Sequence, residues 1–247
     1  MGLFDGMDLG GGTAVATEER VAGGSNFINK TGAYDVVIQK AYMDVSSGGA
    51  ICFNLVLETK DGKQMNVTEY ISNGKKEVYY TDKKDGTKKF MPSYTRMKNI
   101  DFLLTGKPQQ NPKIESKKVK VYDYDAKGDV IKDKEVMVEW VGKPLTILCT
   151  KKKSWKQAKD ASGAYVNTTE VQFRTEIDFY LDPVTRKTHN EISGNKDADI
   201  YKNWMEKYGS DDTYVYDRTG VKTNTATPPT PTTMEDVLDW WVSSSYN

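Results

Sequence analysis

The residues best suited to chemistry in this chain lie between positions 75 and 98, where lysines are interleaved with aromatic rings. Lysine ammonium groups can hold phosphates, and an open ring can stack on any nucleobase with about 1–3 kcal/mol per base. The pattern therefore favours a sequence-tolerant site for single-stranded nucleic acid, with an affinity that falls as salt rises. The residues predicted for this first cluster are Lys75, Lys76, Tyr79, Tyr80, Lys83, Lys84, Lys88, Lys89, Phe90, Tyr94, Arg96 and Lys98.

Two shorter clusters follow, KKVKVYDY at 117–124 and KKKSWK at 151–156. Alternate residues share one face of a strand, so each cluster would present a row of cations and rings. For any one cluster the alternative is a solvated charged loop with its rings turned into the core, but three clusters in one stretch favour binding. We predict one row with Lys118, Lys120, Tyr122 and Tyr124, and a second with Lys151, Lys153 and Trp155, while Lys152 and Lys156 take its opposite face.

Charge is distributed unevenly, although the whole chain is neutral with 35 Lys and Arg and 35 Asp and Glu. Residues 60–160 hold 24 Lys and Arg against 14 Asp and Glu, and the rest of the chain balances this excess. A basic working surface with acidic regions elsewhere would produce this division. Ordinary surface charge in uneven blocks is the alternative.

The sequence lacks the residue sets that common catalytic sites need. One histidine, His189, and two cysteines, Cys52 and Cys149, are too scattered for a zinc site or a histidine-activated nucleophile. The cysteines lie in apolar runs and are predicted to be buried free thiols. Asp123 and Asp125 form a D-x-D pair that could hold Mg²⁺, although such a pair more often flanks a turn. We therefore predict a protein that is not an enzyme, with no catalytic residue, metal or cofactor.

Short runs of alternating apolar residues separated by glycine turns predict a mainly β fold. Residues 34–44, 50–58 and 64–71 read as three strands joined by tight turns. With only two brief helices, the pattern indicates an OB-like antiparallel β-barrel, closed or nearly closed. The other predicted elements are strands at 117–124, 134–141, 143–156 and 164–181, helices at 93–105 and 197–207, and a polar loop at 73–92.

The last predicted strand has the strongest alternation in the chain. Its apolar residues fall on one face, which we expect to be buried, and its charged residues fall on the other, which we expect to be wet. The residues of the expected buried face are Val171, Phe173, Thr175, Ile177, Phe179 and Leu181.

Composition divides the chain into three regions: a flexible Gly-rich arm at 1–30, the OB-like domain with insertions at 31–221, and a Pro/Thr linker with an acidic-aromatic tail at 222–247. The first residues lack a basic, apolar leader, and no window approaches the roughly 20 apolar residues of a membrane span. We therefore expect a cytoplasmic protein without a membrane partner. The tail is predicted to bind replication or transcription proteins through Glu235, Asp236, Leu238, Asp239, Trp240 and Trp241.

Two parts of the chain carry a resemblance to a known family. The first is TGAYDVVIQKAYMDVSSGGAICFNLVLETKDGKQMNVTEYISNGK with the later FMPSY and LLTGK, and the second is KKKSWK, YVNTTEVQFRTEIDFYLDPVTRKTHNEISG and YKNWMEKYG. They cover most of residues 31–209 and resemble phage-encoded single-stranded DNA-binding proteins of the lytic podovirus type. The resemblance implies an OB-fold that coats single strands in phage DNA replication and recombination, and in some relatives assists a polymerase, in the cytoplasm of the host. Members commonly end in a strongly acidic tail, from which this chain departs.

Three functions are compatible with these features. The first is a sequence-tolerant single-stranded DNA-binding protein whose rings stack on bases and whose cations hold phosphates. The second is a structural or adaptor protein, such as a virion or complex component, that uses its strands for protein contacts. The third is a metal-dependent nuclease built on Asp123 and Asp125. The basic-aromatic clusters favour the first.

Overall fold

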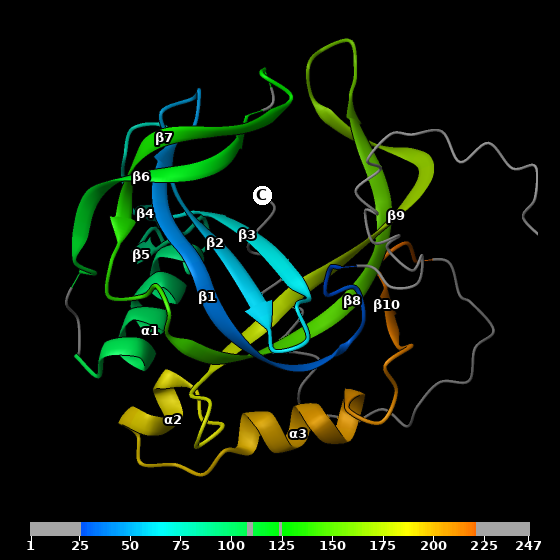
Figure 1. Ribbon diagram of the computed structural model, residues 1–247. Coiled ribbons are helices and arrows are strands. Elements are labelled where there is room, and N and C mark those ends of the chain that lie inside the picture. The colour runs from blue at the N-terminus through cyan, green and yellow to red at the C-terminus, as the bar shows by residue number, and fades with distance from the viewer. Residues whose placement is uncertain (1–25, 108–110, 124, 221–247) are drawn as a thin grey trace, which may run out of the picture.

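The computed structural model describes residues 26–107, 111–123 and 125–220 of the chain (Figure 1). The fold is mainly β, as predicted, with a large antiparallel sheet and three helices in these ranges. None of these helices has the length and apolar character that crossing a lipid bilayer requires. Tyr124 and the tail residues Glu235, Asp236, Leu238, Asp239, Trp240 and Trp241 lie outside the described residues.

The elements follow one another in chain order as strands interrupted by helices. The strands are β1 (Gly32–Val45), β2 (Ile51–Thr59), β3 (Gln64–Tyr70), β4 (Tyr79–Thr81), β5 (Lys88–Phe90), β6 (Ile114–Asp123), β7 (Gly128–Met137), β8 (Pro144–Lys159), β9 (Tyr165–Leu181) and β10 (Val215–Asp217). The helices are α1 (Pro92–Thr105), α2 (His189–Ser193) and α3 (Asp199–Tyr208). The described residues begin at 26, inside the segment 1–30 that was predicted to be an arm. There, Phe27 forms a parallel bridge to Gln64, and Ile28 is buried.

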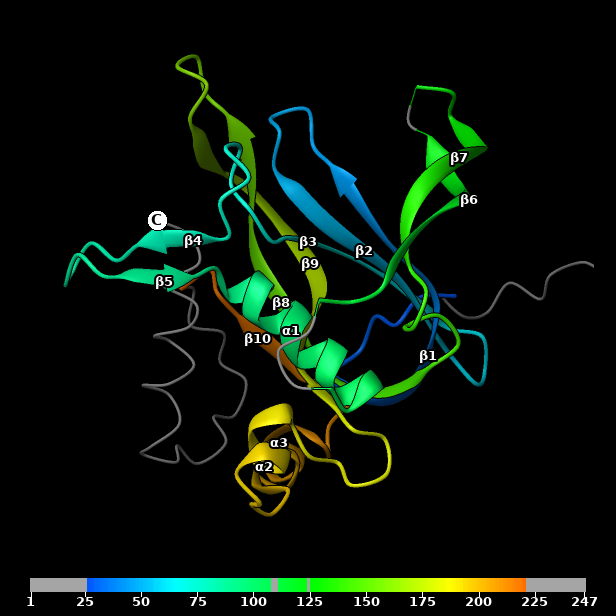
Figure 2. The same cartoon turned by 90° about the vertical axis from the view of Figure 1, so that its left-hand side faces the viewer.

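The sheet branches at β1. One edge of β1 pairs antiparallel with β2, which in turn pairs with β3. On the other edge, Gly32–Val37 pair with β8, whereas Tyr42 and Met43 pair with β7. The hairpins β6–β7 and β8–β9 therefore leave the same edge of β1 and diverge on opposite sides of the β1–β2 turn (Figure 2).

The sheet does not close into the predicted barrel. Among the strands of the described residues, β3 pairs with β2 and β9 pairs with β8, but β3 and β9 do not pair with each other. The chain leaves β3 for the small β4–β5 sheet and then enters α1 (Figure 2). Met97 and Ile100 of α1 are buried in the core. A helix therefore covers the part of the core that a closing strand pair would cover.

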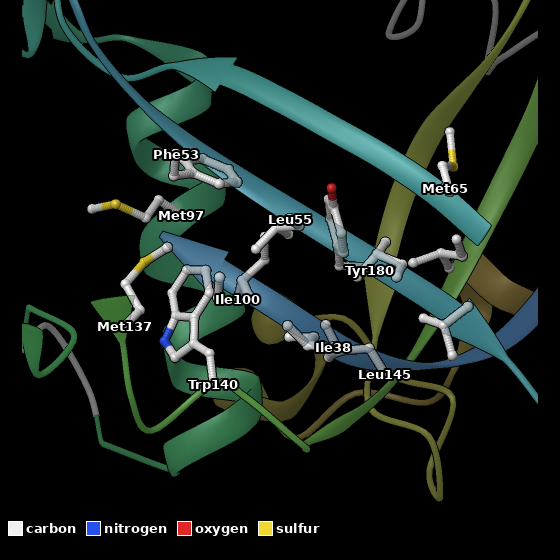
Figure 3. Packing of buried hydrophobic residues seen from close by; sticks show 14 of the residues in the cluster. Ile38, Phe53, Leu55, Met65, Met97, Ile100, Met137, Trp140, Leu145 and Tyr180 are labelled. Carbon is white, nitrogen blue, oxygen red and sulfur yellow. The ribbon is translucent and has the colours of Figure 1, made fainter. Parts of the chain in front are cut away.

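The main core lies between β1, β2, β8 and α1 (Figure 3). The Phe53 ring packs edge-on against Trp140, with ring centroids 6.2 Å apart. The Trp140 indole N–H donates to Asp101 Oδ1 at 2.7 Å, so this buried polar group is satisfied. Cys52 and Cys149 are free and buried, as predicted, and burial raises the pKa of both thiols.

A β-bulge divides β9 between two cores. Leu148 pairs with Phe179 but the next residue, Cys149, pairs with Ile177, so Asp178 is the extra residue. Ile177 then packs on the main core, whereas Phe179 packs with Leu148 in a second cluster under α3. The prediction of one continuous buried face on β9 is therefore wrong, because a bulge reverses the alternation.

The short elements depend on turn chemistry rather than on apolar patterning. The β4–β5 hairpin lies in the segment predicted as a polar loop, and its turn is closed by Asp82, which accepts the N–H of Lys84 at 2.8 Å. Helix α2 begins with a capping box between Thr188 and Glu191. Strand β7 spans Gly128–Met137, whereas the sequence pattern predicts a strand at 134–141.

We expect Asp101→Ala to lower the free energy of unfolding by about 1–3 kcal/mol, because the buried Trp140 indole would lose its acceptor. Asp101→Asn keeps an oxygen acceptor and removes the charge. Burial raises the pKa of Asp101, so the stabilisation by its protonated form is lost as the pH rises through the folded-state pKa. Urea unfolding at pH 4 and pH 7 should therefore show Asp101→Asn gaining stability relative to wild type at the higher pH. Equal differences at both pH values would contradict this.

Candidate nucleic-acid interface

The first cluster assembles a group of rings on the β4–β5 hairpin and the start of α1. Tyr79 lies opposite Phe90 in the register, and Lys88 Nζ lies 4.6 Å from the centroid of the Tyr79 ring. The Phe90 and Tyr94 ring centroids are 5.3 Å apart at 32°, and Phe90 is 60% exposed. We call Tyr79, Lys88, Phe90 and Tyr94 the hairpin platform. Tyr94 also packs against the main core, which fixes the platform to the body of the protein.

Among the other described lysines of the hairpin and the loop before it, one forms ion pairs with carboxylates and four do not. Lys89 pairs with Asp82 at 2.5 Å and with Asp85 at 3.4 Å, and these contacts raise its pKa. Tyr80 lies opposite Lys89, on the other face from Phe90. In the described ranges, no ion pair forms at four exposed lysines on the preceding loop and the hairpin turn, which are Lys75, Lys76, Lys83 and Lys84.

Arg96 is directed into the protein rather than towards solvent. Its guanidinium pairs with Glu69 on β3 at 2.5 Å. Burial alone would lower the pKa of Arg96, but the Glu69 carboxylate outweighs this and the pKa is raised. The other Glu69 oxygen and the Tyr180 hydroxyl are buried without a hydrogen-bond partner among the described residues. Arg96 is thus the counter-charge of a buried carboxylate, and its neighbour Lys98 donates to Asn111 at 3.2 Å.

The second cluster lies on the β6–β7 hairpin but faces away from β1. The side of the hairpin that carries Val121, Lys132 and Lys134 faces Tyr42 and Asp44 of β1, and together they line an open pocket of about 500 Å³. Lys134 pairs there with Asp44 at 2.5 Å. The opposite side carries the predicted row. Lys118 and Lys120 lie there opposite Asp133 and Ile131, Lys120 pairs with Asp129 at 3.0 Å, and Tyr122 near the tip also borders the pocket.

The D-x-D pair at the tip of this hairpin forms a turn. Asp123 Oδ1 accepts the backbone N–H groups of Asp125 and Ala126, both at 2.8 Å, and Oδ2 accepts from Lys132 at 2.5 Å. The Lys132 contact comes first among the causes that lower the pKa of Asp123 to about 2. These contacts already occupy both carboxylate oxygens. The described residues hold no group of three or more His, Cys, Asp or Glu side chains with metal-ligand geometry.

The third cluster lies on the part of β8 that extends beyond the core. Lys151, Lys153 and Trp155 share the face on which Cys149 packs into the main core. Across the register, Lys153 lies opposite Phe173 and Trp155 lies opposite Val171. The set of Lys151, Lys153, Trp155, Val171 and Phe173 is called the β8–β9 face below. Lys151 Nζ lies 5.5 Å from the centroid of the Phe173 ring, which is 54% exposed.

The other side of β8 has a structural role. Lys152 is largely buried and pairs with Glu176 at 3.0 Å and with Asp178 at 3.1 Å. Asp178 in turn accepts the Trp204 indole N–H from α3 at 3.2 Å. Lys152 therefore helps to attach α3 to the sheet, and Lys156 pairs with Glu170 at 3.0 Å on the exposed end of the hairpin.

The hairpin platform and the β8–β9 face each adjoin the main core, the platform through Tyr94 and the β8–β9 face through the neighbouring Cys149 and Ile177. The exposed side of β6–β7 is turned away from β1. Sequence reasoning missed Phe173 and Val171, which it placed in the core. The sequence signal for their exposure was the lysine-rich segment KKKSWK, with which they pair. The end of a strand that is this polar does not lie over the core, so the strand paired with it is exposed there too.

No family model matches the chain, and a search of curated proteins gives no match.

Replacing Arg96 tests its structural role. We expect Arg96→Met to lower the free energy of unfolding by about 1–3 kcal/mol, because the Glu69 carboxylate would stay buried without its cation. Lys107→Met, which breaks the more exposed pair with Glu139, should cost less than about 1 kcal/mol. Urea unfolding of both variants measures the difference. Equal losses would show that Arg96 is an ordinary surface cation.

Proposed function

We propose that this protein binds single-stranded DNA without sequence preference, through the hairpin platform and the β8–β9 face. One observation carries the proposal: each region presents an exposed phenylalanine, Phe90 or Phe173, on the same strand face as a lysine. Contact with water does not stabilise an exposed phenylalanine ring on a strand. Stacking against the flat face of a nucleobase does stabilise it.

The cations beside these rings suit a phosphate backbone. Within the described part of the chain, neither Lys88 nor Lys151 has a carboxylate at ion-pair distance, and each lies over a ring, Tyr79 or Phe173. A strand whose base stacks on the ring would bring its phosphate near the ammonium group. Such contacts release counterions from the strand and give strong salt dependence.

The proposed contacts use features that all nucleotides share. Stacking uses the face of a base and lysine contacts use the phosphate, so neither distinguishes one base from another. Sequence-tolerant binding of this kind suits a protein that coats single strands during phage DNA replication and recombination and assists a polymerase. The resemblance of residues 31–209 to phage single-stranded DNA-binding proteins points the same way.

The proposed contact set is narrower than the sequence indicates. Arg96 and Lys152 are excluded because each neutralises buried carboxylates. Lys118, Lys120 and Tyr122 are not included because the hairpin presents them on a different side. The residues proposed to contact the strand are Tyr79, Lys88, Phe90, Tyr94, Lys151, Lys153, Trp155 and Phe173.

Removing the exposed rings tests the stacking half of the proposal. We expect Phe90→Ala and Phe173→Ala each to weaken binding of a fluorescent oligo-dT by about 1–3 kcal/mol, the value of one base–ring stack. Val184→Ala is the control, because Val184 is 85% exposed but lies in the turn after β9. A titration in which wild type binds no oligo-dT at low salt removes the proposal, and equal affinities for all four proteins remove the stacking role.

Removing a lysine tests the phosphate half. For single strands the slope of log Kobs against log salt is about −0.7 per phosphate contact. We therefore expect Lys151→Gln to make this slope shallower by about 0.7 and to weaken binding of every base composition alike. Lys60→Gln, at the exposed β2–β3 turn, is the matched control and should leave the slope unchanged. Equal slopes for wild type and Lys151→Gln would contradict the assignment.

A further inference from the structure

A short segment of the chain already occupies two residues of the β8–β9 face. Strand β10 runs parallel to β8, with Val215 opposite Lys151 and Asp217 opposite Lys153. The Lys153 ammonium pairs with Asp217 Oδ2 at 3.0 Å. The Trp155 indole N–H donates to the backbone oxygen of Thr219 at 3.2 Å. The segment 215–219 therefore binds one cation and one ring of the proposed site.

Asp217 is held in place for this contact. Its Oδ1 accepts the backbone N–H of Thr219 at 2.8 Å and the Thr219 hydroxyl at 2.6 Å, which leaves Oδ2 for Lys153. The next residue, Arg218, anchors the segment through its backbone N–H to the Lys153 carbonyl at 2.8 Å. The Lys153 and Asp217 side chains are only 21% and 20% exposed, so water screens the pair less than an ordinary surface pair.

The carboxylate of Asp217 offers Lys153 the same interaction as a phosphate oxygen, a charge-assisted hydrogen bond to an anionic oxygen. We propose that Asp217 is a built-in competitor for the strand phosphate at Lys153, so that binding of single-stranded DNA must displace it. The inference rests on the proposed function and adds a means of regulating it. Lys151, two residues earlier on the same face, provides the contrast of a lysine without such a carboxylate in the described residues.

Two consequences follow from displacement of Asp217. On binding, Lys153 exchanges the carboxylate of Asp217 for a phosphate of the strand. The new contact therefore adds little affinity, and it releases fewer salt ions than a contact made by an unpaired lysine. The competition is also constant around neutral pH. Contacts to Thr219 and then to Lys153 lower the pKa of Asp217 to about 2, which keeps its carboxylate ionised.

The test compares full-length wild type with Asp217→Asn, Lys153→Gln and the double variant, by titrating fluorescent oligo-dT across a salt series. Asparagine keeps the oxygen that accepts from Thr219, so the segment retains its local hydrogen bonds. Asp61→Asn is the matched control. Asp61 pairs with Lys63 at 2.7 Å in the β2–β3 turn and also caps its own turn through Thr59.

We expect Asp217→Asn to bind oligo-dT about two- to fivefold more tightly at low salt, the equivalent of one ion pair. Its salt slope should be steeper by about 0.7, because Lys153 then releases counterions like a free lysine. Lys153→Gln should abolish the gain, and Asp61→Asn should show none.

Three outcomes would overturn the inference: unchanged or weaker binding by Asp217→Asn, a gain that persists without Lys153, or an equal gain in Asp61→Asn. Weaker binding would mean that Asp217 only positions Lys153, and the other gains would reflect net charge. Failure of the proposed function is distinguishable, because wild type would then bind no oligo-dT at all. If wild type binds and depends on Phe173 while Asp217→Asn has no effect, only the competitor role is lost.

Discussion

The divided pairing of β1 is the constraint on which the rest of the structure depends. Because Gly32–Val37 pair with β8 and the end of β1 pairs with β7, one edge of a single strand must support two hairpins that move apart. Each hairpin continues beyond the core, and neither is covered by the other (Figure 2). The β8–β9 hairpin therefore presents side chains on a face that begins in the core and ends in solvent. The exposed rings and lysines of the candidate interface result from this geometry.

Ion pairs then distinguish the cationic side chains that stabilise the protein from those that are left for a ligand. Lys152 and Arg96 neutralise buried carboxylates and connect α3 and α1 to the sheet. Lys88 and Lys151 lie over aromatic rings instead. Lys153 is intermediate, because it belongs to the exposed face but is held by Asp217. The sequence alone predicts the same phosphate-binding role for all of these cationic residues, whereas the contacts in the fold differ from one residue to the next.

Much of the fold follows from local sequence patterns, and the remainder depends on contacts between distant residues. Alternation and glycine turns predict β1, β2 and β3 well, because each strand has one buried face. The same rule fails on β9, where the bulge at Asp178 depends on Thr150 and Trp204, which are far away in sequence. Branching at β1 and the outward direction of Lys118 likewise depend on which strands meet. For the site, residue types identified the rings of the hairpin platform, but only the register of β8 and β9 identifies Phe173.

In the proposed complex, a single strand lies over the hairpin platform and the β8–β9 face, and not over the outward side of β6–β7. Photo-crosslinking of a bromodeoxyuridine oligonucleotide to the full chain, followed by mass spectrometry of the crosslinked peptides, tests this placement most directly. Crosslinks within residues 79–94 and 151–173 are the expected result. Crosslinks confined to residues 114–137, or their absence under conditions where the oligonucleotide binds, would contradict it.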